Sequence, residues 1–266
     1  ANNMAILTID IFSRVLERKV PVSAIVPIDN PMVSNPAERF KMMILLHGYN
    51  GNNMDWINNT DIVRYAEENN MVIVMPAGEN KFYIDNAKTG EKYSQFIGEE
   101  LVAYMRKLLP VYCQPQKTCI AGLSMGGYGA IVNGLKYSKT FGYIISLSGA
   151  LFMEKLMRED NNEANERRKK FDALFGTYEE LCGTDADYRS LLEKMRNTDG
   201  KKVPDLYLAC GTYDFWYRAS EDFADYLLRS GVPYVFEKTA ADHEWKFWNA
   251  YIEKGMKWFD ERSSIS

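Results

Sequence analysis

The sequence predicts an α/β fold, in which a mostly parallel sheet of about eight strands is covered by helices on both faces. Short apolar, β-branched runs recur along the chain, as in "KMMILLH", "MVIVMP" and "PYVFEKT". Amphipathic stretches such as "DIVRYAEEN" and "SQFIGEELVAYMRKLLP" separate most of these runs. Strands that alternate with helices indicate a parallel sheet, because each connecting helix returns across one face of it.

The predicted strands are eight runs spread over the whole chain, at residues 5–12, 21–27, 41–47, 71–76, 117–124, 142–149, 204–211 and 233–239. Only the turn-like stretch "SRVLERK" separates the first two, so we expect them to form an antiparallel hairpin before the parallel part begins. Amphipathic helices are predicted after the third run, at residues 61–69, 94–110, 125–138 and 222–231.

One segment interrupts this alternation. Residues 151–202 contain no convincing strand, only charged helical stretches such as "MEKLMREDNNEANERRKKF". An insertion after a strand end is expected to lie over the carboxyl edge of the sheet, where open α/β folds bind their ligands. The sequence therefore predicts a helical cap, although a solvated helical elaboration without contact to any site is the alternative.

Composition restricts the class of protein and its partners. The chain has 266 residues, of which 46% are hydrophobic and 26% charged, as expected for a single domain over residues 1–266. Its net charge is −4 and its lysines and arginines are scattered, which argues against nucleic acid as a partner. No apolar run reaches the roughly 20 residues of a membrane span, so no membrane association is expected.

The start of the sequence, "ANNMAILTID", lacks the character of a signal peptide. With Met4 as the natural start we expect a cytoplasmic protein, while secretion after removal of a signal peptide stays open.

The four cysteines do not suggest a metal site or a disulfide framework. They form no C-x-x-C pair, and no histidine lies at metal-ligand spacing from them. Cys119 and Cys210 lie in apolar runs and are predicted to be small buried core residues. No metal and no organic cofactor is expected.

The stretch "GLSMGG" has the form G-x-S-x-G, with strand-like "KTCIA" before it and helix-like "YGAIVNGLKYS" after it. This pattern is typical of a nucleophilic serine, here Ser124, on a sharp turn from strand to helix. Small residues are needed at Gly122 and Gly126, because Cβ atoms there would collide in the turn. The same turn leaves the amide of Met125 at a helix N-terminus, where it can face developing negative charge.

A serine hydroxyl needs a base, and the chain contains only His47 and His243. In a fold with this turn the base follows the serine in chain order, on a loop after the last strand. His243 lies just beyond "PYVFEKT" and meets this requirement. His47 ends an earlier strand before "GYNG", so it is expected to belong to an oxyanion-hole loop in which a backbone N–H near Tyr49 complements that of Met125.

The third member of the site should be a carboxylate at the end of a strand between the serine and the histidine. Asp214, in "DLYLACGTYDFWY", follows a buried strand and a glycine and fits this position. An ionised acid there holds the imidazole in the correct tautomer and stabilises the imidazolium. The other acids in this region are expected to be solvated surface residues: Asp205, Asp222, Asp225 and Asp242.

Four stretches, "LLHGYNGNNMDW", "GLSMGGYGA", "CGTYDFWY" and "DHEWKFW", together resemble the esterase D and tributyrin esterase group of α/β-hydrolases, which is related to S-formylglutathione hydrolases and feruloyl and acetyl-xylan esterases. The resemblance extends over nearly the whole chain and is weakest across residues 151–202. It implies the α/β-hydrolase fold, with Ser124, Asp214 and His243 as the triad and the amides of Tyr49 and Met125 as the oxyanion hole. Because "LLHGYNG" departs from the corresponding loop of S-formylglutathione hydrolases, a carboxylester is expected rather than a glutathione thioester.

Aromatic residues near these motifs are candidates for a substrate pocket. Trp56 and Trp216 are predicted to bind substrate, whereas the four-residue spacing of Phe215 and Phe223 predicts that both lie in the core. Other aromatic candidates for the pocket are Tyr128, Phe152, Tyr217, Trp245 and Trp248. The predicted function is a serine carboxylesterase for short or medium acyl esters, including acylated sugars. A thioesterase, an acyltransferase and a catalytically silent binding module are the alternatives, and homo-oligomerisation is left open.

Overall fold

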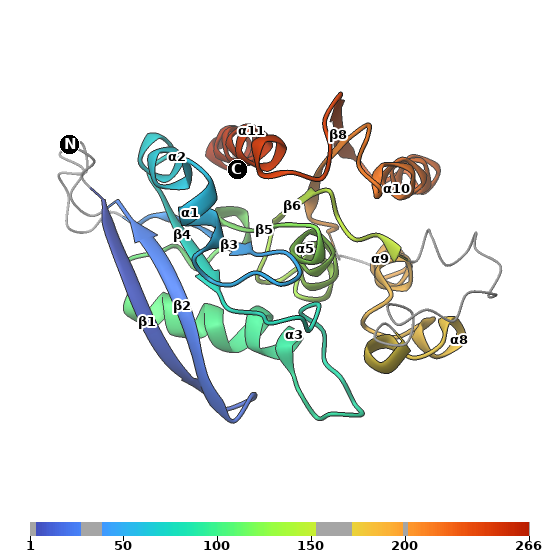
Figure 1. The fold of residues 1–266 in the computed structure, drawn as a ribbon, viewed down its shortest axis with the longest axis horizontal. Helices are drawn as coiled ribbons and strands as arrows, with labels where there is room; N and C mark the ends of the chain where they lie inside the picture. The colour runs from blue at the N-terminus through green and yellow to red at the C-terminus, as the bar shows by residue number, and fades with distance from the viewer. Residues whose placement is uncertain (1–3, 28–38, 153–171, 199–201, 266) are drawn as a thin grey trace.

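The computed structural model describes residues 4–27, 39–152, 172–198 and 202–265. They form one eight-stranded sheet with strand order β1-β2-β4-β3-β5-β6-β7-β8 and helices on both faces (Figure 1). The strands have these bounds: β1 Ala5–Ser13, β2 Arg18–Val26, β3 Lys41–Leu46, β4 Met71–Pro76, β5 Thr118–Leu123, β6 Tyr143–Leu147, β7 Asp205–Gly211 and β8 Tyr234–Thr239. Each of the eight predicted runs is a strand, and the predicted fold class is confirmed.

The strand directions also follow the prediction. β1 pairs antiparallel with β2 as a hairpin, and β2 pairs antiparallel with β4. From β4 onward every pairing is parallel, so the carboxyl ends of β3, β5, β6, β7 and β8 meet at one edge of the sheet. In an open sheet of this kind, that edge is where a ligand site forms.

Helices of several lengths connect the strands. Their bounds are α1 Asp55–Asn59, α2 Ile62–Glu68, α3 Tyr93–Gln95, the π-helix η1 Phe96–Leu101, α4 Val102–Leu108, the 3₁₀-helix η2 Pro115–Lys117, α5 Met125–Lys136, α8 Tyr178–Leu181, α9 Tyr188–Arg196, α10 Tyr217–Arg229 and α11 Trp245–Ile265. Within the described parts of the chain, no helix combines the length and apolar character that crossing a membrane requires.

Successive residues of the central strands serve two separate cores. Met42 and Ile44 of β3 belong to the core that includes residues of α4, α5 and α10, whereas Met43 and Leu45 belong to the core that includes residues of α2 and α11. Side chains alternate between the faces of a strand, so a strand buried on both sides must be apolar at every position. This requirement explains why "MMILL" is an uninterrupted apolar run.

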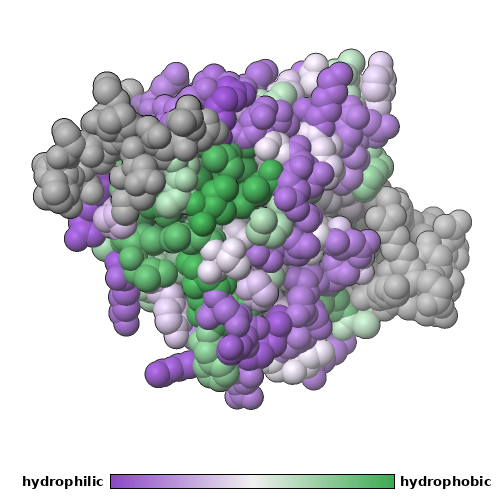
Figure 2. Space-filling model, turned by 60° about the vertical axis from the view of Figure 1, so that its left-hand side comes forward, coloured by the Kyte–Doolittle hydropathy of each residue, from purple (hydrophilic) through white to green (hydrophobic). Residues whose placement is uncertain are grey.

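The hairpin forms the edge of the sheet. Alternate β1 side chains remain exposed, among them Ile6 and Phe12, with 49% and 57% of their surface accessible. Figure 2 shows apolar side chains gathered on the side of the molecule where the hairpin lies. The structure contains a single chain, so oligomerisation stays untested.

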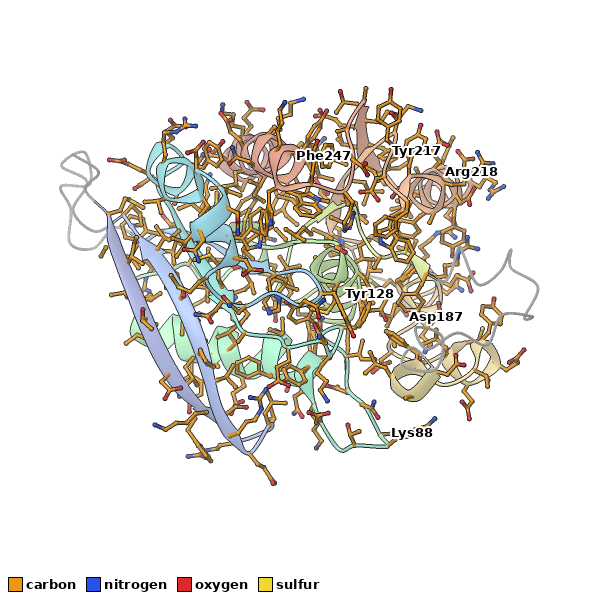
Figure 3. All side chains as sticks on the ribbon, viewed as in Figure 1. Lys88, Tyr128, Asp187, Tyr217, Arg218 and Phe247 are labelled. Atoms are coloured by element: carbon orange, nitrogen blue, oxygen red, sulfur yellow. The ribbon has the colours of Figure 1, made fainter. Side chains whose placement is uncertain are left out.

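The predicted cap segment is described only in part, because residues 153–171 and 199–201 lie outside the described residues. In the described part, Asp187 caps α9 by accepting from the N–H groups of Arg189 and Ser190. The Tyr128 hydroxyl of α5 donates to the Ala186 carbonyl over 2.7 Å (Figure 3). This bond links α5 to the residue that precedes Asp187, the N-cap residue of α9. The division of the chain into one domain with a cap stays a prediction.

Candidate active site

Ser124 lies at the sharp turn between β5 and α5. Its backbone dihedrals are φ 52° and ψ −116°, in the left-handed region that residues with a Cβ rarely adopt. Its N–H donates to the Leu147 carbonyl over 2.9 Å, and its own carbonyl accepts from the N–H groups of Tyr128 and Ala150. Hydrogen bonds from two directions therefore hold this strained residue, and its hydroxyl faces a pocket.

Glycines permit the close approach that the turn requires. A Cβ on Gly122 would lie 2.4 Å from the carbonyl carbon of Gly126, and a Cβ on Gly126 would lie 2.5 Å from the Leu46 oxygen. Neither distance leaves room for a carbon atom. The small residues predicted on both sides of Ser124 are thus needed where α5 crosses the ends of β5 and β3.

His243 and Asp214 come from the loops after β8 and β7. His243 Nε2 lies 3.1 Å from Ser124 Oγ, and His243 Nδ1 lies 2.7 Å from Asp214 Oδ2. The Asp214 side chain is fully buried, and its other oxygen accepts from the Trp216 N–H over 2.8 Å. An ionised carboxylate can only accept, so Nδ1 carries the proton and Nε2 is free to accept one from Ser124.

Two aromatic rings border the His243 imidazole. The Phe215 ring lies 4.5 Å from it at an angle of 41°, and the Trp248 ring lies 4.8 Å away, edge to face. The Trp248 indole is itself held, because its N–H donates to Ser148 Oγ over 3.1 Å. The imidazole is therefore restrained by packing as well as by its hydrogen bonds.

His47 has a different environment, in keeping with its predicted loop role. Its Nε2 accepts from the Gly78 N–H over 2.8 Å, so Nδ1 carries the proton and donates to the Gly48 carbonyl over 2.7 Å. Burial lowers the pKa of His47 and outweighs the opposing effects of Gly48 and Asp55. Both ring nitrogens are engaged, so this neutral side chain shapes the loop after β3.

Tyr49 and Met125 lie beside Ser124 and line the same pocket. Met125 is the first residue of α5, where a backbone N–H has no acceptor within the helix. The loop that carries Tyr49 is fixed by the bond from the Asn50 N–H to Asn80 Oδ1, which is 2.7 Å long. The structure thus brings together the two residues whose amides were predicted to face a developing oxyanion.

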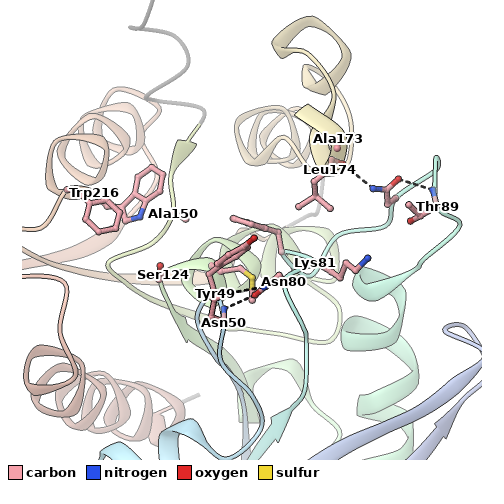
Figure 4. A pocket seen from close by; sticks show the side chains of 14 residues that line it. Tyr49, Asn50, Asn80, Lys81, Thr89, Ser124, Ala150, Ala173, Leu174 and Trp216 are labelled. Carbon is pink, nitrogen blue, oxygen red and sulfur yellow. Dashed lines mark hydrogen bonds between the residues drawn. The ribbon is translucent and has the colours of Figure 1, made fainter. Parts of the chain in front are cut away.

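The pocket over Ser124 has a volume of about 720 Å³ (Figure 4). Its lining contains both apolar and polar residues. The apolar and aromatic lining residues are Tyr49, Phe82, Met125, Ala150, Ala173, Leu174, Phe215 and Trp216. The polar ones besides the serine are Asn50, Asn80, Lys81, Asn86 and Thr89. Sequence reasoning missed this polar group; the only available signal was that most of it follows a predicted strand, β4, at the same sheet edge.

The structure corrects two predictions about aromatic residues. Trp216 lines the pocket, but Trp56 does not: it is 1% exposed and donates to the Leu46 carbonyl over 3.1 Å within the core. Phe223 is buried as predicted, whereas Phe215 is 55% exposed and lines the pocket. Phe215 precedes α10, which begins at Tyr217, so helical spacing does not apply to it.

Among the other aromatic candidates, Tyr128 and Phe152 are buried in a cluster of rings that includes Phe82 and Phe175. The Phe82 ring of this cluster also lines the pocket. The cluster therefore supports the pocket wall from behind.

Comparison with known proteins shows the family of the chain. The chain is 36% identical over 266 residues to an acetyl esterase of Caldicellulosiruptor saccharolyticus, covering 98% of this chain and all of that protein. Its structure resembles the substrate-bound fluorophosphonate-binding serine hydrolase F of Staphylococcus aureus, with a TM-score of 0.84, 29% identity and coverage of 97% and 98% of the two chains.

It also resembles an S-formylglutathione hydrolase of Staphylococcus aureus, with a TM-score of 0.83, 30% identity and coverage of 97% and 99%. Residues 13–259 match the family described as "Putative esterase". These similarities support a serine hydrolase with carboxylesterase activity and the α/β-hydrolase fold. The chain belongs to this esterase family.

Proposed function

We propose that the protein hydrolyses short- to medium-chain acyl esters, acylated sugars included, with Ser124 as nucleophile, His243 as general base and Asp214 as the acid that orients it. The observation that carries this proposal is the chain of hydrogen bonds from Ser124 Oγ through the His243 ring to buried Asp214, 3.1 and 2.7 Å long. Activation of a weak nucleophile by a base that a third group orients requires this arrangement.

In the acylation step, Ser124 Oγ attacks the ester carbonyl while His243 Nε2 takes the hydroxyl proton. The carboxylate of Asp214 stabilises the imidazolium that forms. The backbone N–H groups of Tyr49 and Met125 donate to the oxyanion. The bond between the carbonyl carbon and the alcohol oxygen then breaks, His243 gives its proton to the leaving alcohol, and the acyl group stays on Ser124.

Deacylation repeats this sequence with water. His243 takes a proton from a water molecule, the resulting hydroxide attacks the acyl carbon, and the same two amides hold the second oxyanion. The bond to Ser124 Oγ breaks and the serine recovers its proton from His243. The products are a carboxylic acid and the free enzyme, and no step requires a metal or an organic cofactor.

The pocket and one relative support the proposed substrate range. A cavity of about 720 Å³ exceeds the size of an acetyl group, and apolar side chains of Ala150, Phe215 and Trp216 line it near the serine. The acetyl esterase that is 36% identical to this chain supports short acyl groups. Trp216 is the aromatic side chain that we propose contacts the substrate.

A thioesterase or acyltransferase would use the same three residues, and the similarity to an S-formylglutathione hydrolase favours the thioesterase as second candidate. A comparison of kcat/KM for an acetate ester and an acetate thioester of matched leaving-group size separates an esterase from a thioesterase. Transfer of the acyl group to added alcohols instead of water would indicate the acyltransferase.

The direct test is labelling with a fluorophosphonate probe. We expect the wild-type protein to be labelled and Ser124→Ala to remain unlabelled. A series of p-nitrophenyl esters of increasing chain length, extended with feruloyl and acetylated-sugar esters, then measures specificity, and kcat/KM should be highest for short to medium chains. Absence of both labelling and ester hydrolysis in the folded wild-type protein would exclude the proposal.

A further inference from the structure

One side of the pocket, here called the polar end, carries polar groups that take no part in the proposed acyl transfer. Its lining side chains carry amide, ammonium or hydroxyl groups: Asn50, Asn80, Lys81, Asn86 and Thr89. In Figure 4, Lys81 and Thr89 lie to one side of Ser124, together with the apolar Ala173 and Leu174, and Trp216 lies to the other. Apolar acyl groups gain nothing from such a lining, because its polar groups would lose water without gaining a partner.

Hydrogen bonds within the protein hold this polar end in place. The Asn50 N–H donates to Asn80 Oδ1 over 2.7 Å, and Asn80 Nδ2 donates to Asn50 Oδ1 over 3.0 Å. Asn86 Nδ2 donates to the Leu174 carbonyl over 3.2 Å, which links the loop after β4 to the predicted cap segment. Side chains held in this way form a binding surface before any ligand arrives.

The backbone at this end is strained. Asn50 has φ 65°, and Glu79, Phe82 and Tyr83 in the neighbouring loop have φ of 48°, 54° and 58°. Residues with a Cβ persist in this region only where the surroundings enforce it, and they cluster at ligand sites. The fold therefore maintains a costly loop conformation beside the pocket.

The charges of Lys81 and Glu91 balance each other at the polar end. Among the described residues that line the pocket, only Lys81 is charged, and its Nζ lies 2.7 Å from Glu91 Oε2, which also accepts from Thr89 Oγ1 over 2.9 Å. Burial would raise the pKa of Glu91, but the hydrogen bonds from Lys81 and Thr89 outweigh it and lower that pKa below its ordinary value. Glu91 therefore remains ionised at neutral pH and balances the lysine.

We propose that this polar end binds a neutral, hydroxylated part of the substrate, such as a sugar, and that the Lys81–Glu91 ion pair makes it select against substrates that carry a carboxylate. Hydroxyl groups can donate to the Asn50 and Asn80 oxygens, each of which accepts one hydrogen bond within the protein, and can accept from the remaining N–H groups of Lys81. A substrate carboxylate would compete with Glu91 for the same ammonium and would be repelled by it. This inference rests on the proposed esterase function and specifies its substrate class.

The test uses one acetyl group on two matched alcohols, a monoacetylated methyl glucoside and a monoacetylated methyl glucuronide, with p-nitrophenyl acetate as reference. We expect wild-type kcat/KM to be higher for the glucoside than for the glucuronide. Glu91→Gln frees the Lys81 charge and should shift this ratio toward the glucuronide by about tenfold. Lys81→Met should lower kcat/KM for the glucoside about tenfold more than for p-nitrophenyl acetate.

Two further variants control for damage to the loop. Lys88→Met removes a lysine that pairs with Glu180 at 3.9 Å, projects from the outer end of the same loop (Figure 3) and does not line the pocket, so the ratio should not change. The exchanged pair Lys81→Glu with Glu91→Lys keeps the ion pair and should retain the preference for the glucoside.

The inference is overturned if the wild-type protein hydrolyses both sugars equally, or if Glu91→Gln changes all substrates by the same factor. Failure of the exchanged pair to retain the preference would also overturn it. Each of these results is compatible with full fluorophosphonate labelling and p-nitrophenyl acetate hydrolysis. Loss of those two signals in the wild-type protein would instead refute the esterase mechanism itself.

Discussion

Replacing Asp214 by asparagine tests the proposed mechanism with almost no change in shape. One carboxylate oxygen accepts from the Trp216 N–H over 2.8 Å and the other accepts from His243 Nδ1 over 2.7 Å. In Asp214→Asn the amide must turn its oxygen toward the Trp216 N–H, because its NH₂ group cannot accept from it. The NH₂ group then faces His243 Nδ1.

This exchange forces the imidazole into the wrong tautomer. Nδ1 must accept from the amide, so the proton moves to Nε2, which lies 3.1 Å from Ser124 Oγ and can then no longer take the serine proton. A triad acid replaced by its amide typically lowers kcat by about 10⁴. That factor corresponds to about 5.4 kcal/mol of transition-state stabilisation.

The assay compares kcat/KM for p-nitrophenyl acetate in wild type, Asp214→Asn and Asp225→Asn. Asp225 is exposed on α10, so its variant loses one charge without touching the site and should keep its activity. Thermal unfolding of each variant shows whether the fold is retained. If folded Asp214→Asn kept activity within tenfold of wild type, the assignment of Asp214 and the tautomer argument would be wrong.

The remaining predictions concern the nucleophile, the loop histidine and the pocket. Ser124→Ala should lower ester hydrolysis by about 10⁴ to 10⁶ while circular dichroism stays unchanged, and near-wild-type turnover would remove the serine from the mechanism. Burial lowers the pKa of His47, so the unfolded chain takes up a proton below about pH 6.5 that the folded chain does not, and stability should fall as pH drops from 7 toward 5. The melting temperature of His47→Asn should depend less on pH across that window; an identical dependence would contradict the assignment of His47 as a neutral buried group. Trp216→Ala enlarges the pocket on its apolar side near Ser124 and should raise kcat/KM for longer p-nitrophenyl esters relative to the acetate; an unchanged chain-length profile would show that this residue does not limit the pocket.

Much of the fold could be predicted because it follows from local patterns. A strand buried on both faces must be apolar at every position, so runs such as "MMILL" are strands of a covered parallel sheet. The nucleophile turn was equally readable, because the approach of α5 to β5 and β3 leaves no room for a Cβ at Gly122 or Gly126.

The candidate site was harder to predict where it depends on side-chain direction. Phe215 has the helical spacing of a core residue, yet it lies before the first residue of α10 and packs on His243 instead. Trp56 lies in a stretch rich in polar residues, but its indole reaches the Leu46 carbonyl inside the core. Spacing along the chain does not specify these directions, because they depend on neighbours that are distant in sequence.

The strands of the sheet, the order of the elements and the candidates Ser124, Asp214 and His243 follow from the amino-acid sequence alone. Burial periodicity and turn chemistry are local properties, and the chain has only two histidines. Only the folded chain shows that one pocket is lined by Asn50, Asn80, Lys81, Asn86 and Thr89. These residues lie on two loops whose positions are set by the pairing of β3 with β4 and by hydrogen bonds between the loops. No local sequence pattern predicts that these two loops lie side by side, because their positions depend on how strands distant in sequence pair.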